Sequence, residues 1–118
     1  MRAIRGATCL RADDQAEMTE AVAEMLTAIV DRNGLSEQDI VSVLFTSTPD
    51  LVCGFPASAA RAIGFRDIPL MCAQEISVSG ALPRVVRVMV LVETGRSRAD
   101  VEHVFLRGAQ VLREDLNR

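Results

Sequence analysis

The chain has 118 residues, of which 49% are hydrophobic and 25% are charged. This is about the modal size of one domain with the composition of a packed protein, which argues against disorder and against a multidomain enzyme. We therefore expect a single domain over residues 1–118. The net charge of −3 argues against a nucleic-acid or anionic membrane partner, since such binding needs a surplus of cations.

Secretion, membrane insertion and metal chemistry are not indicated either. The first ten residues lack the apolar core of a signal peptide, and no stretch approaches the roughly 18 uncharged apolar residues of a membrane helix. Cys9, Cys53 and Cys72 are widely spaced without a CxxC pair, so we expect neither a disulfide framework nor a zinc site. His103 is the only histidine. The expectation is a cytoplasmic protein without a metal centre.

The cations have an unusual composition, because all 13 of them are arginine. A guanidinium is a permanent, planar and forked cation that suits carboxylate and phosphate groups. A general bias toward arginine codons explains the count equally well. Only the position of each arginine can therefore indicate which of them bind an anion.

The first residues predict a strand followed by a long helix. Residues 2–10 alternate as a strand does. Asp13 or Asp14 can then cap a helix whose apolar residues between 18 and 30 recur at helical spacing. Gly34 lies where that helix is expected to stop.

The middle of the chain predicts a second strand and a short helix. A capped turn at 36–39 leads into the β-branched run 40–48, which is typical of a buried strand and is ended by Pro49. Pro56 suits the first turn of a short helix, and Gly64 suits its end.

The second half is rich in strand patterns, at 69–78, at 85–93 and within 101–112, with a turn at 79–83. The order is therefore strand, long helix, strand, short helix, and then about three strands. This order predicts an α/β or α+β domain with a mixed β-sheet and helices on one face.

Several charges occupy positions where a strand should be apolar. Alternation places Arg87 on a face with apolar neighbours in 85–93, and places Glu75 as the only charge on its face in 69–78. Arg5 repeats the anomaly in the first strand, and Arg113 follows the last. A guanidinium is costly to bury alone, so an anion should face it. Glu75 could pair with Arg87, the strands could be solvated edges, or the charges could line a pocket for a small polyanion.

Six short segments, most of them holding one of these charges, together indicate a family. They are IRGAT at 4–8, TPDL at 48–51, FPASAAR at 55–61, CAQE at 72–75, RVVRVMV at 84–90 and HVFLRGAQVLREDL at 103–116. In order and spacing they resemble the monofunctional chorismate mutases of the trimeric, barrel-like class. The resemblance covers nearly the whole chain.

That resemblance implies a homotrimer in which the β-sheets form a pseudo-barrel core and three active sites lie between neighbouring subunits. It also implies an isomerase that converts chorismate to prephenate, a step of phenylalanine and tyrosine biosynthesis. The reaction is a Claisen rearrangement that needs no nucleophile, proton transfer or cofactor. Chorismate is then the expected ligand.

The resemblance also implies roles for individual residues. Arg87 matches the arginine at the ether oxygen, where negative charge develops as the C–O bond breaks. Arg5 matches the arginine that grips a substrate carboxylate, and Glu75 matches the acceptor for the ring hydroxyl. Cys72 matches a thiol near that hydroxyl, although it can equally be a small buried hydrophobe.

The remaining matches are peripheral. Phe55 and Leu112 match apolar walls, whereas Arg61 and Arg113 match cations at the cleft entrance and can equally be solvated surface charges. Met71 is included as a substrate contact, although relatives have small polar residues there and methionine would narrow or dry the pocket.

Phe105 is the main departure, because the family commonly has tyrosine at this position. A phenol would donate to a substrate carboxylate and Phe105 cannot, which weakens binding by roughly 1.5–3 kcal/mol. Two alternatives follow: a non-catalytic trimer that binds a small carboxylate or acts as a regulatory partner, or a related trimeric interface enzyme such as an enamine or imine deaminase. The usual motifs of the deaminases are not visible in the sequence.

Overall fold

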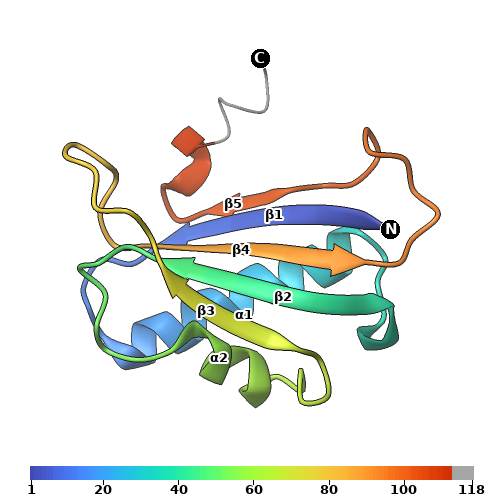
Figure 1. Cartoon of the computed structure of the whole chain (residues 1–118), viewed down its shortest axis with the longest axis horizontal. Helices are drawn as coiled ribbons and strands as arrows, with labels where there is room; N and C mark the ends of the chain where they lie inside the picture. The colour runs from blue at the N-terminus through green and yellow to red at the C-terminus, as the bar shows by residue number, and fades with distance from the viewer. Residues whose placement is uncertain (113–118) are drawn as a thin grey trace.

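Five strands form one mixed sheet in the order β3-β2-β4-β1-β5 (Figure 1). A computed structural model describes residues 1–112. The three central strands are β1 (Arg2–Cys9), β4 (Val85–Val92) and β2 (Ile40–Ser47), and β4 runs antiparallel to both of its neighbours. The outer strands β3 (Leu70–Gln74) and β5 (Val104–Leu106) run parallel to β2 and β1, respectively.

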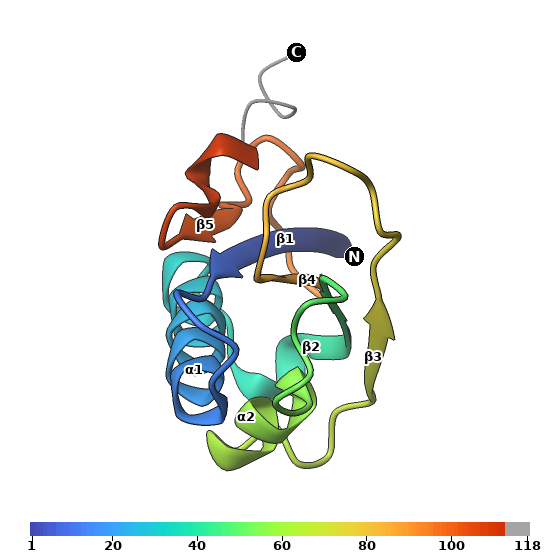
Figure 2. The ribbon, with the colours of Figure 1, turned by 90° about the vertical axis from the view of Figure 1, so that its left-hand side faces the viewer.

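The helices α1 (Gln15–Arg32) and α2 (Pro56–Ala62) lie together on one side of the sheet (Figure 2). Asp14 caps α1 by accepting a hydrogen bond from the backbone N–H of Glu17 at 2.8 Å. Gly34, with φ +60°, follows the C-terminal cap of α1. A 3-10 turn (Glu37–Asp39) leads into β2. The predicted fold class and the helix positions are confirmed.

Alternation along the strands gives the sheet two different faces. On β4, Val86, Val88 and Val90 are buried in the core that the sheet forms with α1 and α2. Arg87 and Met89 point to the other face, which we call the open face because neither helix covers it. The fold therefore needs the even-numbered residues of β4 and leaves Arg87 available to bind a ligand.

Two predicted strands are shorter in the structure. The strand expected at 69–78 ends at Gln74, although the N–H of Glu75 still donates to the carbonyl of Ser47 at 2.9 Å. The strand expected within 101–112 is confined to β5, because Arg107 and Gly108 have φ values of 53° and 91° and reverse the chain. Residues 109–112 form a 3-10 turn, so the strand prediction there was wrong.

Ion pairs to α1 hold the reversal after β5. The guanidinium of Arg107 contacts Glu20 at 3.0 Å and Glu24 at 3.1 Å, and hydrogen bonds to Glu24 and Glu20 raise the pKa of Arg107. Within residues 1–112, no helix is long and apolar enough to cross a membrane.

Candidate active site

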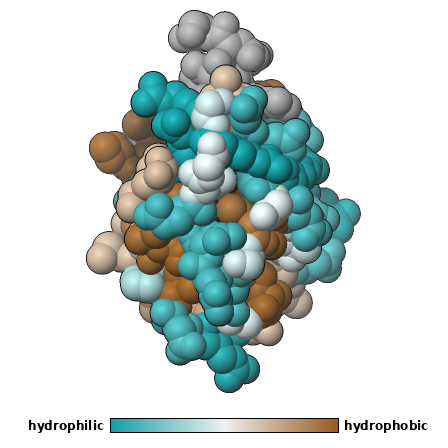
Figure 3. All heavy atoms as spheres, turned by 90° about the vertical axis from the view of Figure 1, so that its right-hand side faces the viewer, coloured by the Kyte–Doolittle hydropathy of each residue, from teal (hydrophilic) through white to brown (hydrophobic). Residues whose placement is uncertain are grey.

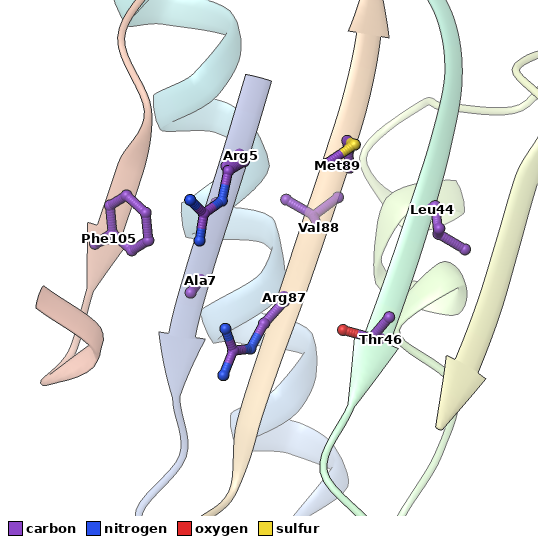
Figure 4. Close-up of a pocket in the computed structure, with 9 residues that line it drawn as sticks. Arg5, Ala7, Leu44, Thr46, Arg87, Val88, Met89 and Phe105 are labelled. Carbon is purple, nitrogen blue, oxygen red and sulfur yellow. The ribbon is translucent and has the colours of Figure 1, made fainter. Parts of the chain in front are cut away.

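A pocket of about 180 Å³ opens on the open face between β5, β1, β4 and β2 (Figure 4). We call it the arginine pocket, because Arg5 from β1 and Arg87 from β4 both line it. The strand register brings these residues together, since Arg87 pairs with Ala7 of β1 and Arg5 pairs with Met89 of β4. The pocket is lined by Arg5, Gly6, Ala7, Leu44, Thr46, Arg87, Val88, Met89 and Phe105.

Glu75 contacts Arg87 from beside this pocket. Oε2 of Glu75 lies 3.2 Å from Nε of Arg87, and it accepts a hydrogen bond from the hydroxyl of Thr46 at 2.7 Å. The contact with Nε is an ion pair whose geometry is not that of a hydrogen bond, although Nε itself is buried. Glu75 and Arg87 also line an adjoining cavity of about 380 Å³.

Two of the three interpretations of the sequence therefore apply together, because Glu75 pairs with Arg87 and Arg87 also lines a pocket. The Glu75 side chain is 18% exposed, whereas that of Arg87 is 38% exposed. The ion pair engages Nε of Arg87, and the same side chain lines the arginine pocket.

Arg5 lies over an aromatic ring. Its Cζ atom is 5.7 Å from the centroid of Phe105, which pairs with Ala7 through β5 and is only 7% exposed. This is within the range of a cation–π contact. The backbone N–H of Arg5 donates to Nδ1 of His103 at 2.9 Å. The segment 103–105 thus contacts Arg5 at both its backbone and its guanidinium.

Phe55 and Cys72 do not line the arginine pocket. They line a separate cavity of about 350 Å³ between the loop before α2 and strand β3. Cys72 pairs with the buried residue Phe45, so it lies on the helix side of the sheet and packs partly against the core. Phe55 is 72% exposed at the start of α2. Within this one chain, neither residue meets Arg5 or Arg87.

The other predicted site residues are also dispersed. Met71 is 66% exposed on the open face of β3, and Arg61 is exposed on α2 and lines neither cavity that holds Arg5 or Phe55. Leu112 is half-buried and packs against a small cluster that includes Phe105. Arg113 lies outside the described residues.

Thr46 lines the arginine pocket and was not among the residues predicted from the sequence. It pairs with Arg87 across β2 and β4, and its hydroxyl binds Glu75. Alternation in the predicted strand 40–48 places Leu44 and Thr46 opposite the buried residues Val43 and Phe45, so the signal was present. Alternation alone does not place Thr46 beside Arg87, because that requires the register of β2 against β4.

The loop before α2 is held by Asp13. Oδ1 of Asp13 accepts hydrogen bonds from the N–H groups of Val52 and Cys53, both at 3.0 Å. A hydrogen bond from the Cys53 thiol is the main factor that lowers the pKa of Asp13. Burial and Asp13 together raise the pKa of Cys53 to about 11. This thiol is therefore protonated at neutral pH and is a poor nucleophile.

Comparison with known proteins gives one consistent result. A chorismate mutase from Clostridium thermocellum superposes with a TM-score of 0.92 at 42% identity, which covers 94% of this chain and 99% of that one. The curated relative "Chorismate mutase AroH" of Thermus thermophilus is 43% identical over 98% of this chain and 96% of its own length. The protein of the same name from Bacillus subtilis is 37% identical, over 99% and 93%. The family model "Chorismate mutase type I" matches residues 1–116, and the chain belongs to this family.

Proposed function

We propose that this chain catalyses the Claisen rearrangement of chorismate to prephenate, as an isomerase of aromatic amino acid biosynthesis. Membership of the chorismate mutase type I family supports the reaction. The observation that carries it is the convergence of Arg5, Arg87 and Glu75 on one side of the sheet, where they offer two cations and one carboxylate. Chorismate carries two carboxylates, a ring hydroxyl and an ether oxygen, which suit these groups.

Arg87 stabilises the transition state in this proposal. As the C–O bond breaks, negative charge develops on the ether oxygen, and a preorganised guanidinium donor favours that charge. Removal of one such donor typically costs about 10²- to 10³-fold in rate. The contact with Glu75 holds Arg87 in place before the substrate arrives, so little reorganisation is required during the reaction.

Arg5 binds a substrate carboxylate and restrains the flexible side chain over the ring. Phe105 supports this role, because its ring lies under the guanidinium and restricts where Arg5 can move. Holding two reacting carbons in contact lowers the free-energy barrier, by about 7–11 kcal/mol in ideal intramolecular systems. No proton has to move in this reaction.

Glu75 accepts a hydrogen bond from the ring hydroxyl of the substrate. Thr46 and Arg87 both contact Oε2 of Glu75, and the side chain stays 18% exposed, so a ligand hydroxyl can reach the carboxylate. The negative carboxylate also stabilises the positive charge that develops on the ring. Glu75 therefore has two uses, orientation of the ring and electrostatic balance.

A homotrimer with active sites between subunits completes the site. The open face carries the exposed apolar side chains of Leu44, Met71 and Met89, which are 40%, 66% and 45% exposed. Figure 3 shows hydrophobic side chains reaching the surface between hydrophilic ones at one end of the molecule. The exposed apolar side chains of the open face favour its burial against another subunit. A second copy can then bring Phe55 and Cys72, which one chain keeps away from Arg5, to the arginine pocket.

The assembly can be tested by light scattering after size-exclusion chromatography. We expect a mass near three times 12.8 kDa. Leu44→Glu should give a monomer with little activity, because a charge on the open face opposes burial. Ile63→Glu, which places the same charge beside α2, should remain trimeric. A monomeric wild-type protein with full activity would contradict the proposal.

Loss of the ultraviolet absorbance of chorismate tests the reaction directly, and the chain has no Trp or Tyr to obscure the signal. A rate no greater than the spontaneous one at saturating substrate would overturn the proposal. Tight binding of a bicyclic transition-state analogue separates a mutase from a non-catalytic carboxylate-binding homologue. We place the reaction in the cytoplasm, which suits three free cysteines.

A further inference from the structure

The side chain of His103 accepts a backbone hydrogen bond that a carbonyl of a neighbouring strand would normally accept. The pairing of β5 with β1 begins where Val104 pairs with Gly6, so His103 immediately precedes the paired residues. Its Nδ1 atom accepts the backbone N–H of Arg5 at 2.9 Å. The imidazole therefore extends the pairing of β1 and β5 by one residue, to Arg5.

This contact fixes the chemical state of the imidazole. An imidazole nitrogen that accepts a hydrogen bond from an N–H carries no hydrogen itself. His103 is accordingly neutral when it binds Arg5, with its hydrogen on Nε2. Its side chain is half-buried and lines a cavity of about 300 Å³ together with Arg2, Arg5 and Arg98.

The backbone of Arg5 lies between strand β4 and the segment that leads into β5. Met89 of β4 pairs with it on one side, and His103 binds its N–H on the other. Two residues after His103, the ring of Phe105 lies 5.7 Å from the Arg5 guanidinium. One short segment, residues 103–105, therefore contacts both the backbone and the guanidinium of Arg5.

We propose that His103 is a positioning residue, which acts through its Nδ1 atom to place Arg5 for the substrate carboxylate. This inference rests on the proposed function, because it assigns Arg5 a ligand. His103 does not touch the substrate itself, and its effect on catalysis passes through Arg5.

Two substitutions separate the acceptor atom from the bulk of the ring. In His103→Asn, the side-chain oxygen takes nearly the place of Nδ1 and still accepts a hydrogen bond, whereas His103→Leu keeps an apolar side chain without an acceptor. We expect His103→Leu to raise KM on the order of tenfold with a smaller change in kcat, because a lost internal hydrogen bond has about that effect. His103→Asn should restore most of the wild-type KM.

A double-mutant cycle tests whether the effect passes through Arg5. Arg5→Ala alone should raise KM strongly. In that background, His103→Leu should change KM less than twofold, because the side chain that it positions is absent. Equal effects of His103→Leu with and without Arg5 would overturn the proposal and leave His103 a structural residue. Thermal melting of each variant confirms that it folds.

A readout without turnover keeps this inference separate from the proposed function. Nitrogen NMR of the wild-type protein should show the Nε2–H tautomer, and amide exchange at Arg5 should be slow. His103→Leu should accelerate that exchange, and His103→Asn should slow it again. If these results appear in a protein that does not convert chorismate, the proposed function fails and the placement of Arg5 stands. If His103 is protonated or carries its hydrogen on Nδ1 at neutral pH, the inference fails whatever the activity.

Discussion

Nε of Arg87 in β4 lies 3.2 Å from Oε2 of Glu75, the residue that directly follows β3, although β3 and β4 are not neighbours in the sheet. Strand β2 lies between them, and its residue Thr46 donates to the same carboxylate oxygen. The three side chains therefore form a row on the open face. Because the carboxylate is the shared partner, its position depends on both contacts.

Substitution of Arg87 tests its role in the transition state. Arg87→Ala should lower kcat about 10²- to 10³-fold. Arg87→Lys should recover little, because an ammonium is a single point charge and cannot reach both Glu75 and the ether oxygen as a forked guanidinium can. Arg66→Ala, which removes an exposed arginine elsewhere, is the matched control for net charge. A near-normal kcat for Arg87→Ala would show that the assigned role is wrong.

Thr46→Val tests the support of Glu75. The substitution keeps the shape of the side chain and removes the 2.7 Å hydrogen bond to the carboxylate. A hydrogen bond to a charged group is worth about 1.5–3 kcal/mol, so kcat/KM should fall by more than about tenfold. Thr19→Val, on the exposed surface of α1, removes a hydroxyl that binds only a helix carbonyl and should leave kcat/KM unchanged. Equal kinetics for the two variants would contradict the role of Thr46.

Phe105→Tyr should lower KM with little effect on kcat. The added phenol supplies a donor for a substrate carboxylate next to Arg5, and it keeps the ring under the guanidinium. Phe105→Leu removes the ring and should raise KM, since Arg5 loses its cation–π partner. Steady-state kinetics of the three proteins at one pH measure both effects. An unchanged KM for Phe105→Tyr would place the substrate carboxylate elsewhere.

Gly6→Ala should destabilise the fold because there is no space for a side chain. A Cβ at this position would meet Cγ1 of Val88 at 2.9 Å and Cδ1 of Ile29 at 3.0 Å. Overpacking of this kind typically costs about 1–3 kcal/mol in the free energy of unfolding. Gly95→Ala is the control, since its Cβ would meet nothing within 4 Å. Denaturant titration of both variants should separate them clearly; equal midpoints would contradict the close contact of β1 with α1.

Alkylation of Cys53 should be slow below about pH 11. The pKa is raised to about 11, so the reactive thiolate is scarce at pH 8–9. Asp13→Asn removes the negative charge and carboxylate that disfavour the thiolate, and it should accelerate alkylation of Cys53 at pH 9. Mass spectrometry of the Cys53 peptide over a pH series measures the rate. A midpoint near pH 8.5, as for an ordinary thiol, would rule out this environment.

Much of the fold was predictable because its signals are local. Asp14 and Gly34 bound α1, and the alternation that isolates Arg87 on one face of β4 depends only on the period of a strand. The end of β5 was not predictable in this way. The chain reverses there at Arg107, a residue that seldom adopts positive φ, and contacts with Glu20 and Glu24 of α1 hold it.

The residues of the candidate site were predictable in kind, and their arrangement only in part. The anomalous charges identified Arg5, Glu75 and Arg87, because a charge on an apolar strand face stands out in the sequence. The contribution of Thr46 depends on the register of β2 against β4, which one sequence does not specify. Phe55 belongs to a different cavity of the same chain, a separation that appears only in three dimensions.

Mutations on the two faces of β4 should affect different properties, namely folding on one face and ligand binding on the other. Val86, Val88 and Val90 are buried in the core, whereas Arg87 and Met89, which alternate with them, line the arginine pocket. A deep mutational scan of this strand should therefore alternate, with loss of abundance at one residue and loss of function without loss of abundance at the next. Ligand specificity on this sheet can evolve by single substitutions that leave the scaffold unchanged.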